Sequence, residues 1–446
     1  MTVEHFDRAL FRRIPEAHLK TMYENPHIRL PFDAKDLAVY LHETGEMPMR
    51  ALDYHHRSAD LGLTGPIEDT DNGHVYFQVD VKGVGFLFPE SYESVKHHIP
   101  KGEWRGAKGP QLLIDSKETP WEYDVYGLMD KRMAKDAIDR SEALTKIGVR
   151  TEAVAAVYET DAIYVESETV TIKEIKDRME KQWQEKIAGA RTPEEKARYQ
   201  KMRRNFREQF TPVILTRLVR SVFRLRDIVD EPARREAMLD EACDVLNREM
   251  TLLGQPASFE TRTPQGREQW MEHTAGLQGK NLGLMHANNF VHGYLHMGNL
   301  TLAGEIVDLD SVTPLIREKK TVADEDRDLP FFHETEKGCA FLDPKTLGYQ
   351  RPDPAFGLPM LLIKDMRDLC FSIRQSIRNL TTLKPADRAR VAARMADAYE
   401  QALQGREPYA AIGIANSALV NAFRSMADTI VTRDKHVGPI PQDRSE

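Results

Sequence analysis

The sequence contains little cysteine and no long apolar run. Its 446 residues include three cysteines, Cys243, Cys339 and Cys370, which lie far apart and match no metal-binding spacing. This argues against a disulfide framework and favours a reducing compartment. The first residues have no apolar signal core, and no run reaches the ~18 apolar residues that a membrane span needs. We therefore expect a soluble, cytoplasmic protein without a membrane partner.

An excess of positive charge is also absent. The chain has 62 Lys and Arg against 70 Asp and Glu, a formal net charge of -8, which gives no support to a nucleic-acid partner. We find no internal repeat and no low-complexity segment. Hydrophobic residues make up 41% and charged residues 30%, which is an ordinary globular balance for a chain long enough to form two or three lobes.

The pattern of apolar residues changes along the chain. "HVYFQVDVKGVGFLF" is β-branched and aromatic, so it predicts a strand, or a hairpin at Gly83 and Gly85. "DKRMAKDAIDRSEALTKIGV" predicts an amphipathic helix that ends at Gly148, and "TEAVAAVYE" and "AIYVESETVTI" predict two strands. Earlier in the chain, "DAKDLAVYLHET" has helical signals. From residue 210 the pattern is mostly helical, including "TPVILTRLVRSVFRLRD", and "LTLAGEIVDLDSV" interrupts it with a hairpin signal around "AGE".

Residues 173–208 are highly charged at helical spacing. They predict two exposed helices broken near "GARTP", either as a solvated helical hairpin or as a protein-binding surface. The order of all elements predicts an α+β fold with a small β-rich N-terminal lobe and a larger helical C-terminal lobe. The expected divisions are an extension at 1–60, an N-lobe at 61–230 that carries this insertion, and a C-lobe at 231–446 that carries a metal-binding hairpin at 291–312.

A lysine and a group of acids in the first half could form part of a phosphate site. Lys82 lies in an apolar strand and must place its ammonium in polar surroundings, such as nucleotide phosphates or solvent. Acids on the following helix, Asp136, Asp139 and Glu142, could hold that lysine in position, as in kinase-like folds, or could simply face water.

Four arginines are interleaved with Val, Leu and Phe in "VILTRLVRSVFRLRD". Half-buried guanidinium groups require anions, which are either bound phosphates or carboxylates of the chain itself. The four are Arg217, Arg220, Arg224 and Arg226.

The stretch "VHGYLHMGNLTLAGEIVDLDSV" could bind a metal. His292 and Gly293 begin a tight turn, and Asn299 and Asp308 stand on either side of the expected hairpin. An asparagine and an aspartate so placed can share one Mg²⁺, which prefers oxygen ligands. Without metal, the same two side chains would satisfy a turn and cap a helix. The spacing of His292 and His296 gives little support to zinc, because the stretch is a turn without a further soft ligand nearby.

These pieces together resemble selenoprotein O, a family of kinase-like protein adenylyltransferases. "VDVKGVG" is similar to its strand lysine motif, and "SEALTKIGVRTEAVAAV" to its block of helix end, glycine turn and strand. "LTRLVRSVFR" is similar to its two arginines seven residues apart, and "HGYLHMGNLTLAGEIVDLDS" to its metal-binding turn. The resemblance covers residues 70 to 312 in the family's order, with 173–208 as an insertion.

The resemblance implies a protein-kinase-like bilobal fold that binds ATP with Mg²⁺, or with Mn²⁺ in its place. It implies that Lys82 contacts nucleotide phosphates, that Arg217 and Arg224 hold the terminal phosphates, and that Asn299 and Asp308 bind the metal. ATP in that family is reversed relative to ordinary kinases. AMP is therefore transferred to a protein or small-molecule acceptor, and pyrophosphate leaves.

The sequence departs from the family at the helix glutamate and at the catalytic base. The glutamate position falls on Ala137, and the two positions where related enzymes carry the base hold Tyr294 and Gly298. His296, whose unperturbed pKa would be ~6.5, and Asp310 are the candidate replacements.

Three functions remain open on these grounds. The first is Mg-ATP-dependent AMP transfer, with a carboxylate acceptor that needs no base and a mixed anhydride that an amine can attack, as in a ligase. The second is kinase-like phosphate transfer to a small molecule or protein. The third is an inactive ATP-binding pseudokinase.

Overall fold

The computed structural model describes ten segments of the chain, which form two compact units. The first unit comprises Met1–Ile138 and Ala153–Val219, and the second comprises Asp139–Glu152 and Arg220–Glu446. The described residues are 8–41, 45–51, 58–84, 112–114, 123–125, 129–165, 168–256, 259–315, 360–380 and 383–431. Cys339 and Gly85 lie outside them.

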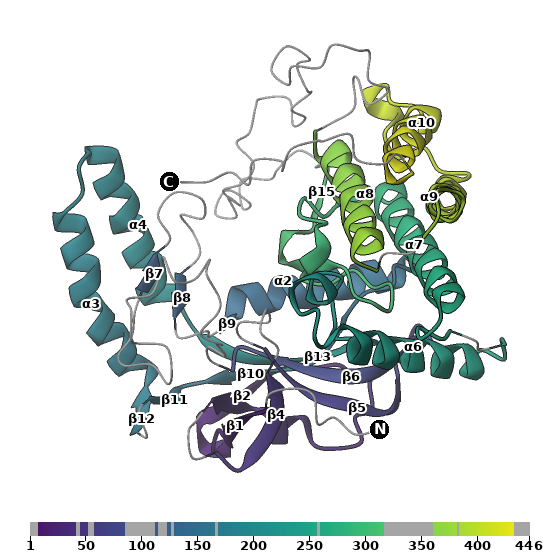
Figure 1. The fold of residues 1–446 in the computed structure, drawn as a ribbon. Coiled ribbons are helices and arrows are strands. Elements are labelled where there is room, and N and C mark those ends of the chain that lie inside the picture. The colour runs from purple at the N-terminus through teal and green to yellow at the C-terminus, as the bar shows by residue number, and fades with distance from the viewer. Residues whose placement is uncertain are drawn as a thin grey trace. The chain divides into compact units, whose positions relative to one another are not determined.

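An antiparallel sheet of nine strands among the described residues forms the first unit (Figure 1). Its order is β2-β10-β13-β6-β5-β4-β1-β3, with β9 beside β13. The strands are β1 (Arg8–Arg13), β2 (Leu19–Glu24), β3 (Val39–Leu41), β4 (Met47–Ala51), β5 (Ser58–Glu68), β6 (Val75–Lys82), β9 (Met129–Asp130), β10 (Ala153–Thr160) and β13 (Pro212–Val219). Two short hairpins lie outside this sheet, β7 (Leu112–Ile114) with β8 (Tyr123–Val125) and β11 (Ala162–Val165) with β12 (Glu168–Thr171).

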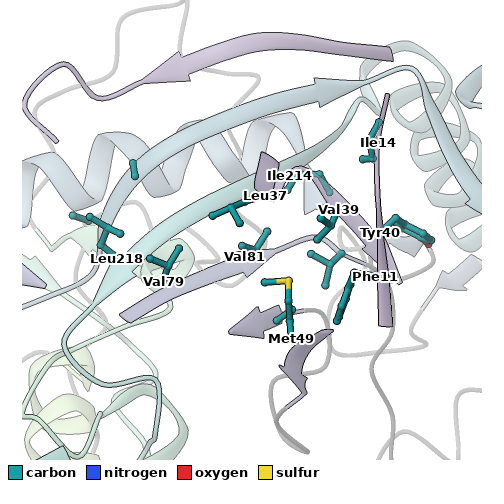
Figure 2. Packing of buried hydrophobic residues seen from close by; sticks show 14 of the residues in the cluster. Phe11, Ile14, Leu37, Val39, Tyr40, Met49, Val79, Val81, Ile214 and Leu218 are labelled. Carbon is teal, nitrogen blue, oxygen red and sulfur yellow. The ribbon is translucent and has the colours of Figure 1, made fainter. Parts of the chain in front are cut away.

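Strand β6 separates an apolar face of the sheet from a buried polar one. Val79 and Val81 pack into a cluster with residues such as Phe11 and Ile214 (Figure 2). Side chains alternate along a strand, so Asp80 and Lys82 point to the other face, where both are buried. The strand predicted at this place is confirmed, and it ends at Lys82.

Helix α2 (Lys131–Lys146) follows the short strand β9. Its residues Ala134, Ala137 and Ile138 pack against Val213 and Leu215 of β13. The small apolar Ala137, at the family's glutamate position, is therefore part of the core. The chain leaves the helix at Gly148, whose φ of 83° suits glycine, as the sequence predicts.

Helices α3 (Ile172–Ala188) and α4 (Pro193–Gln209) form the predicted charged hairpin (Figure 1). Thr171 and Glu174 make a capping box at the start of α3. Glu180 accepts hydrogen bonds from Arg207 and from Arg203 at 3.1 Å, so the helices run antiparallel. Trp183 and Ile175 of α3 are fully buried.

Two helix predictions are wrong. Within "TPVILTRLV", Pro212–Val219 forms the strand β13, which lies inside the sheet between β10 and β6 with all eight residues buried. The mostly helical pattern after residue 210 includes this segment, but burial on both faces favours its β-branched run as a strand. In the described part of "DAKDLAVYLHET", residues 33–41, the 3₁₀ turn η2 (Ala34–Leu37) is followed by β3.

The second unit is mainly helical. Helix α7 packs along α9, where Gly279 and Gly283 face the backbone of Met395 and Tyr399. The helices are α5 (Asp227–Asp230), α6 (Arg235–Leu252), α7 (Pro264–Ala287), α8 (Met360–Leu380), α9 (Pro385–Leu403) and α10 (Asn416–Ala427). The remaining 3₁₀ turns are η1 (Glu16–His18) in the first unit and η3 (Met297–Asn299), η4 (Leu309–Ser311), η6 (Ala410–Ile412) and η7 (Asp428–Ile430) in the second.

The α+β fold class is confirmed, with an antiparallel sheet in the N-terminal part and helices in the C-terminal part. The predicted extension at 1–60 supplies strands β1 to β4 to the sheet. Within the described segments, no helix combines the length and apolarity required to cross a bilayer.

Candidate functional site in the 291–312 turn

Two short strands close the base of the turn in the second unit. β14 (Phe290–Val291) pairs antiparallel with β15 (Thr313–Pro314), so the turn leaves and returns at one place. His292 is fully buried and contacts Val307 and Ser311 through its two ring nitrogens, at 3.2 and 3.1 Å. Burial lowers the pKa of His292, so its ring is a neutral structural group.

The buried carboxylate of Asp365 on α8 anchors the start of the turn. It accepts the backbone N–H of His292 at 2.7 Å and that of Gly293 at 2.8 Å. Gly293 has a φ of 77°, which glycine adopts at little cost. A charged acceptor on two successive amides fixes the direction in which the chain enters the turn.

The predicted hairpin around "AGE" is present in a minimal form. Leu300 and Ile306 make an antiparallel bridge, and the Val307 N–H donates to the Asn299 carbonyl at 3.0 Å. Gly304 takes the tight turn with a φ of 80°. Asn281 of α7 donates to the Gly304 carbonyl at 2.9 Å, so the tip is bound to a helix.

A buried cluster of four charges lies at the hairpin. Glu305 is fully buried, and its two carboxylate oxygens share the single backbone N–H of Arg220, at 2.9 and 3.0 Å. The Arg220 side chain contacts Glu305 at 3.3 Å and Glu249 of α6 at 2.7 Å. Arg150 binds Glu249 at 2.6 Å and the Ala303 carbonyl at 2.9 Å. Each charge therefore has an opposite partner, which buried charges require.

The hairpin brings Asn299 and Asp308 to neighbouring positions. Asn299 is buried, and its amide NH₂ donates to the Tyr294 carbonyl at 2.9 Å, which orients its amide oxygen away from that carbonyl. Asp308 is half-buried and has a left-handed backbone, with φ 65° and ψ 61°. Oxygen donors of this kind suit Mg²⁺ or Mn²⁺. No group of three His, Cys, Asp or Glu in the described residues could hold a metal, so a site here needs the asparagine oxygen.

Arg224 lies beside Asn299. Arg224 and Thr301 form a β-bridge, and the Arg224 guanidinium donates to the Gly298 carbonyl at 2.5 Å. Arg226, two residues on, is more exposed and pairs with Asp230 at 2.8 Å. Of the four arginines in the motif, Arg224 is the one whose guanidinium lies at the Gly298 carbonyl, next to Asn299.

Tyr294 and Lys364 occupy the place of the first missing base. The Tyr294 side chain is 36% exposed, and the Lys364 ammonium lies 4.4 Å from the centre of its ring. Lys364 also donates to the Gly293 carbonyl and pairs with Asp368 at 2.8 Å. A cation over a phenol ring stabilises both groups, but it supplies no base.

His296 fills the space at the second missing base. A Cβ added at Gly298 would lie 3.0 Å from the His296 ring, so an aspartate there requires the ring to move. The Gly298 N–H donates to His296 Nδ1 at 3.1 Å, which leaves the proton of the neutral ring on Nε2. Burial lowers the pKa of His296 to about 4. A ring with this pKa and this tautomer is a weak base. The side chain of Asp310 lies outside the described part of the structure.

Lys82 and Arg217 lie in the first unit. Lys82 is buried on β6, opposite Leu215 of β13. Arg217 is 2% exposed and forms an ion pair with Asp80, directly opposite it across the two strands. The phosphate roles of Lys82 and Arg217 stay predictions. Of the helix acids named for Lys82, Asp136 is half-buried, whereas Asp139 and Glu142 are exposed.

The sequence motifs do not identify the charged residues that hold the turn. Asp365 and Lys364 lie in "MLLIKDMRDL", where charged residues within an apolar helix are a usable signal. Glu305 is a lone acid in the apolar hairpin "LAGEIV", and a lone acid in an apolar segment is a second usable signal. Their partners cannot be read from spacing, because Asp365 lies 73 residues from His292.

No protein-family model matches the chain, and no curated protein matches it. Among solved structures, it is similar to the kinase domain of a rhoptry antigen specific to Toxoplasma gondii, with 11% identity and a TM-score of 0.30 over 87% of this chain and 85% of that one. It is also similar to ROP2 from Toxoplasma gondii, described as a virulence factor with a protein-kinase fold and no enzymatic activity, with 10% identity and a TM-score of 0.30 over 87% and 86%. At these values neither likeness indicates an activity, and the α+β class rests on the elements of the chain itself.

Proposed function

We propose that the chain binds a nucleoside triphosphate with Mg²⁺ at the 291–312 turn and transfers AMP from it, as its resemblance to selenoprotein O implies. The observation that carries the proposal is the hairpin contact between Val307 and the Asn299 carbonyl, which sets Asn299 beside Asp308. A catalytic-loop asparagine and a following aspartate hold Mg²⁺ in protein kinases. Mg²⁺ bound here would neutralise phosphate charge.

Arg224 supports the same proposal. Its guanidinium donates to the Gly298 carbonyl, adjacent to Asn299. If some of its N–H groups donated to phosphate oxygens instead, Arg224 would hold the terminal phosphates, as the resemblance implies. Lys82 and Arg217 would act on phosphates only as the resemblance implies. For Arg217, that role requires the ion pair with Asp80 to be shared with the nucleotide.

The acceptor we propose is a group that is already ionised, such as a carboxylate. Tyr294 and Gly298 stand where related enzymes carry a base, and the ring of His296 is a weak one because its pKa is lowered to about 4. A general base contributes about 10²–10⁴-fold, whereas positioning and charge neutralisation contribute most of phosphate-transfer catalysis. An ionised acceptor needs no general base, so the absence of a base does not lower the rate of transfer to it.

An ATP-binding protein without transfer activity is the second candidate. The contact of Lys364 with the Tyr294 ring favours it, because this pair closes the place of the base with groups that cannot accept a proton at neutral pH. Kinase-like phosphate transfer is a third outcome of the same experiment.

Labelled ATP separates these functions. The protein is incubated with Mg²⁺ and ATP labelled at the α- or the γ-phosphate, and products are identified by mass spectrometry. We expect α-label with a mass gain of AMP, or a ligated product with free AMP. Transfer of γ-label would indicate a kinase instead. ATP binding without any product would establish the inactive candidate and overturn AMP transfer.

Arg224→Ala tests the terminal-phosphate role. We expect it to weaken ATP binding at least tenfold while AMP binding changes little, because AMP lacks the terminal phosphates. Arg226→Ala is the matched control, since Arg226 lies two residues away and pairs with Asp230. Equal losses for ATP and AMP in the Arg224 variant would contradict the role.

We also propose that the α3–α4 hairpin binds an acidic protein segment. Residues 172–209 have a net charge of +5 in a chain whose remaining residues sum to -13. Lys196, Arg204 and Arg207 are exposed along α4. The negative charge of the whole chain opposes long polyanions, so a local acidic segment is the better partner.

A labelled Glu-rich peptide tests this surface. We expect Lys196→Glu with Arg204→Glu to weaken peptide binding at least tenfold. A similar loss should follow in 0.5 M salt, where the Debye length falls well below the ~8 Å of physiological ionic strength. Lys173→Glu, on the exposed side of α3, is the control. Tighter binding of duplex RNA than of the peptide would overturn the choice of partner.

A further inference from the structure

The connection between α2 and β10 forms a second support for the metal-binding hairpin. Thr151 and Ile306 make a parallel bridge, and the Ile306 N–H donates to the Arg150 carbonyl at 3.0 Å. The Thr151 hydroxyl donates to the Ile306 carbonyl at 2.5 Å. Residues 150–152 therefore run beside residues 306–308, and both segments belong to the second unit.

Glu152 ends this supporting segment with a buried carboxylate. The residue is 2% exposed, and its Oε2 accepts the backbone N–H of Asp308 at 3.3 Å. Its own carbonyl accepts the Ser141 hydroxyl of α2 at 2.7 Å, which fixes the backbone of Glu152 against the helix. The backbone that carries this carboxylate is thus held by α2 as well as by the hairpin.

Asp308 has a backbone conformation that needs such support. Its φ of 65° is left-handed, and among the described residues only Asn289 and Asp308 have a positive φ without being glycine. For a residue with a Cβ this conformation is unfavourable. The hydrogen bond from the Asp308 amide to the buried Glu152 oxygen offsets part of this cost. The direction of the Asp308 side chain follows from its φ and ψ.

We infer that Glu152 is a positioning residue, which holds Asp308 in the left-handed conformation that directs its carboxylate to the metal. The inference rests on the proposed function, since it assigns to Glu152 a role in the metal site of Asn299 and Asp308. It acts through a hydrogen bond and not through its charge. Glutamine has an amide oxygen in the same place, so Glu152→Gln should keep the hydrogen bond to the Asp308 amide, whereas Glu152→Ala should lose it.

Mg²⁺ titration at fixed ATP, followed by calorimetry, tests the inference. We expect Glu152→Ala to weaken the apparent Mg²⁺ affinity by about 10–100-fold, as is usual when a residue that orients a metal ligand is removed. Glu152→Gln should stay within about threefold of wild type, well below that range. Glu185→Ala, on the exposed surface of α3, is the control. An unchanged affinity in Glu152→Ala would overturn the inference, and so would equal losses in the alanine and glutamine variants.

Hydrogen exchange without metal or nucleotide separates this inference from the proposed function. We expect the Asp308 amide to exchange at least tenfold faster in Glu152→Ala than in wild type, with glutamine restoring protection. A wild-type protein that shows no Mg²⁺ dependence would overturn the proposed function, while faster exchange would still establish the support of Asp308. Mg²⁺ binding that Asp308→Ala removes and Glu152→Ala leaves unchanged would overturn this inference alone.

Discussion

Single residues show most clearly where spacing in the sequence stops being informative. The arginine motif predicts guanidinium groups in contact with anions, and two of its most buried members contact acids of the chain. Arg217 pairs with Asp80, 137 residues away, and Arg220 with Glu305, 85 residues away. Only the fold brings these acids to the arginines, so the sequence predicts the need for an anion but not which anion meets it.

The pair of Arg217 and Asp80 decides whether Arg217 is free to bind phosphate. Both side chains are about 3% exposed. We expect Arg217→Ala to destabilise the protein by about 3–5 kcal/mol, because it leaves a buried carboxylate without its partner. Chemical denaturation measures the loss.

The double variant Asp80→Leu with Arg217→Met serves as the control for this pair. Two apolar residues of similar volume should recover most of the stability. A single variant that unfolds like wild type but binds ATP poorly would instead support a direct phosphate role.

Glu249 should make the protein sensitive to acid. Burial opposes its charge, but Arg150 and Arg220 lower its pKa from 4.5 to about 2. An acid with a lowered pKa stabilises the folded state above its ordinary pKa, and the stability is lost as the pH falls towards about 2. The contribution is about 3 kcal/mol, and Glu249→Gln should remove its pH dependence between pH 4.5 and 2.

Denaturation curves at pH 7, 4.5 and 3 measure this effect. The exposed Glu185→Gln is the control, and it should follow wild type at each pH. If the free energies of unfolding of Glu249→Gln and wild type keep the same difference from pH 4.5 to 3, then the charge of Glu249 is not the source of the acid sensitivity.

At the scale of elements, helix α7 depends on close approach to α9. A Cβ added at Gly279 would lie 2.1 Å from the Met395 carbonyl oxygen, so a side chain there must separate the helices. We expect Gly279→Val to lower stability by about 3 kcal/mol or more, the upper part of the range for overpacked sites. Thermal unfolding followed by circular dichroism measures it.

Gly65 provides the control for this substitution. Nothing lies within 4 Å of a Cβ added there, and Gly65→Ala should leave the melting temperature nearly unchanged. An equally small effect of Gly279→Val would mean that α7 and α9 are less closely packed than the structure has them.

The elements that the sequence predicts correctly have one dominant pattern each. β6 alternates, α2 repeats at helical spacing up to Gly148, and α3 and α4 are separated at "GARTP". β13 lacks such a signal, because apolar residues on both of its faces leave no alternation. The polar contacts within the turn, such as that of Asp365 with His292, could not be predicted because they are tertiary.

At the scale of the whole molecule, nucleotide binding should raise the free energy of unfolding. A ligand that binds only the folded state at 100 times its Kd adds about 2.7 kcal/mol. We expect Mg-ATP to raise the melting temperature of wild type, and ATP with EDTA to do so much less. Asp308→Ala should abolish the difference between the two conditions, because it removes the proposed metal ligand and leaves the fold.

Glu185→Ala should keep the Mg²⁺-dependent shift, since it lies on the exposed side of α3. A shift that is equal with and without Mg²⁺ in wild type would mean that ATP binds without the metal site. A Mg²⁺-dependent shift in melting temperature that persists in Asp308→Ala would mean that the metal binds at other residues.

The insertion between β10 and β13 has a consequence for how the sheet folds. These neighbouring strands are separated in sequence by β11, β12 and the two helices α3 and α4. Closing a long loop costs entropy, which slows the pairing of distant strands. Contacts between Glu180 and Arg203 or between Lys176 and the Arg207 carbonyl, at 3.0 Å, join the two helices near the ends that lead back to the sheet. Once formed, the hairpin shortens the effective loop, so early helix formation should speed the closure of β10 onto β13.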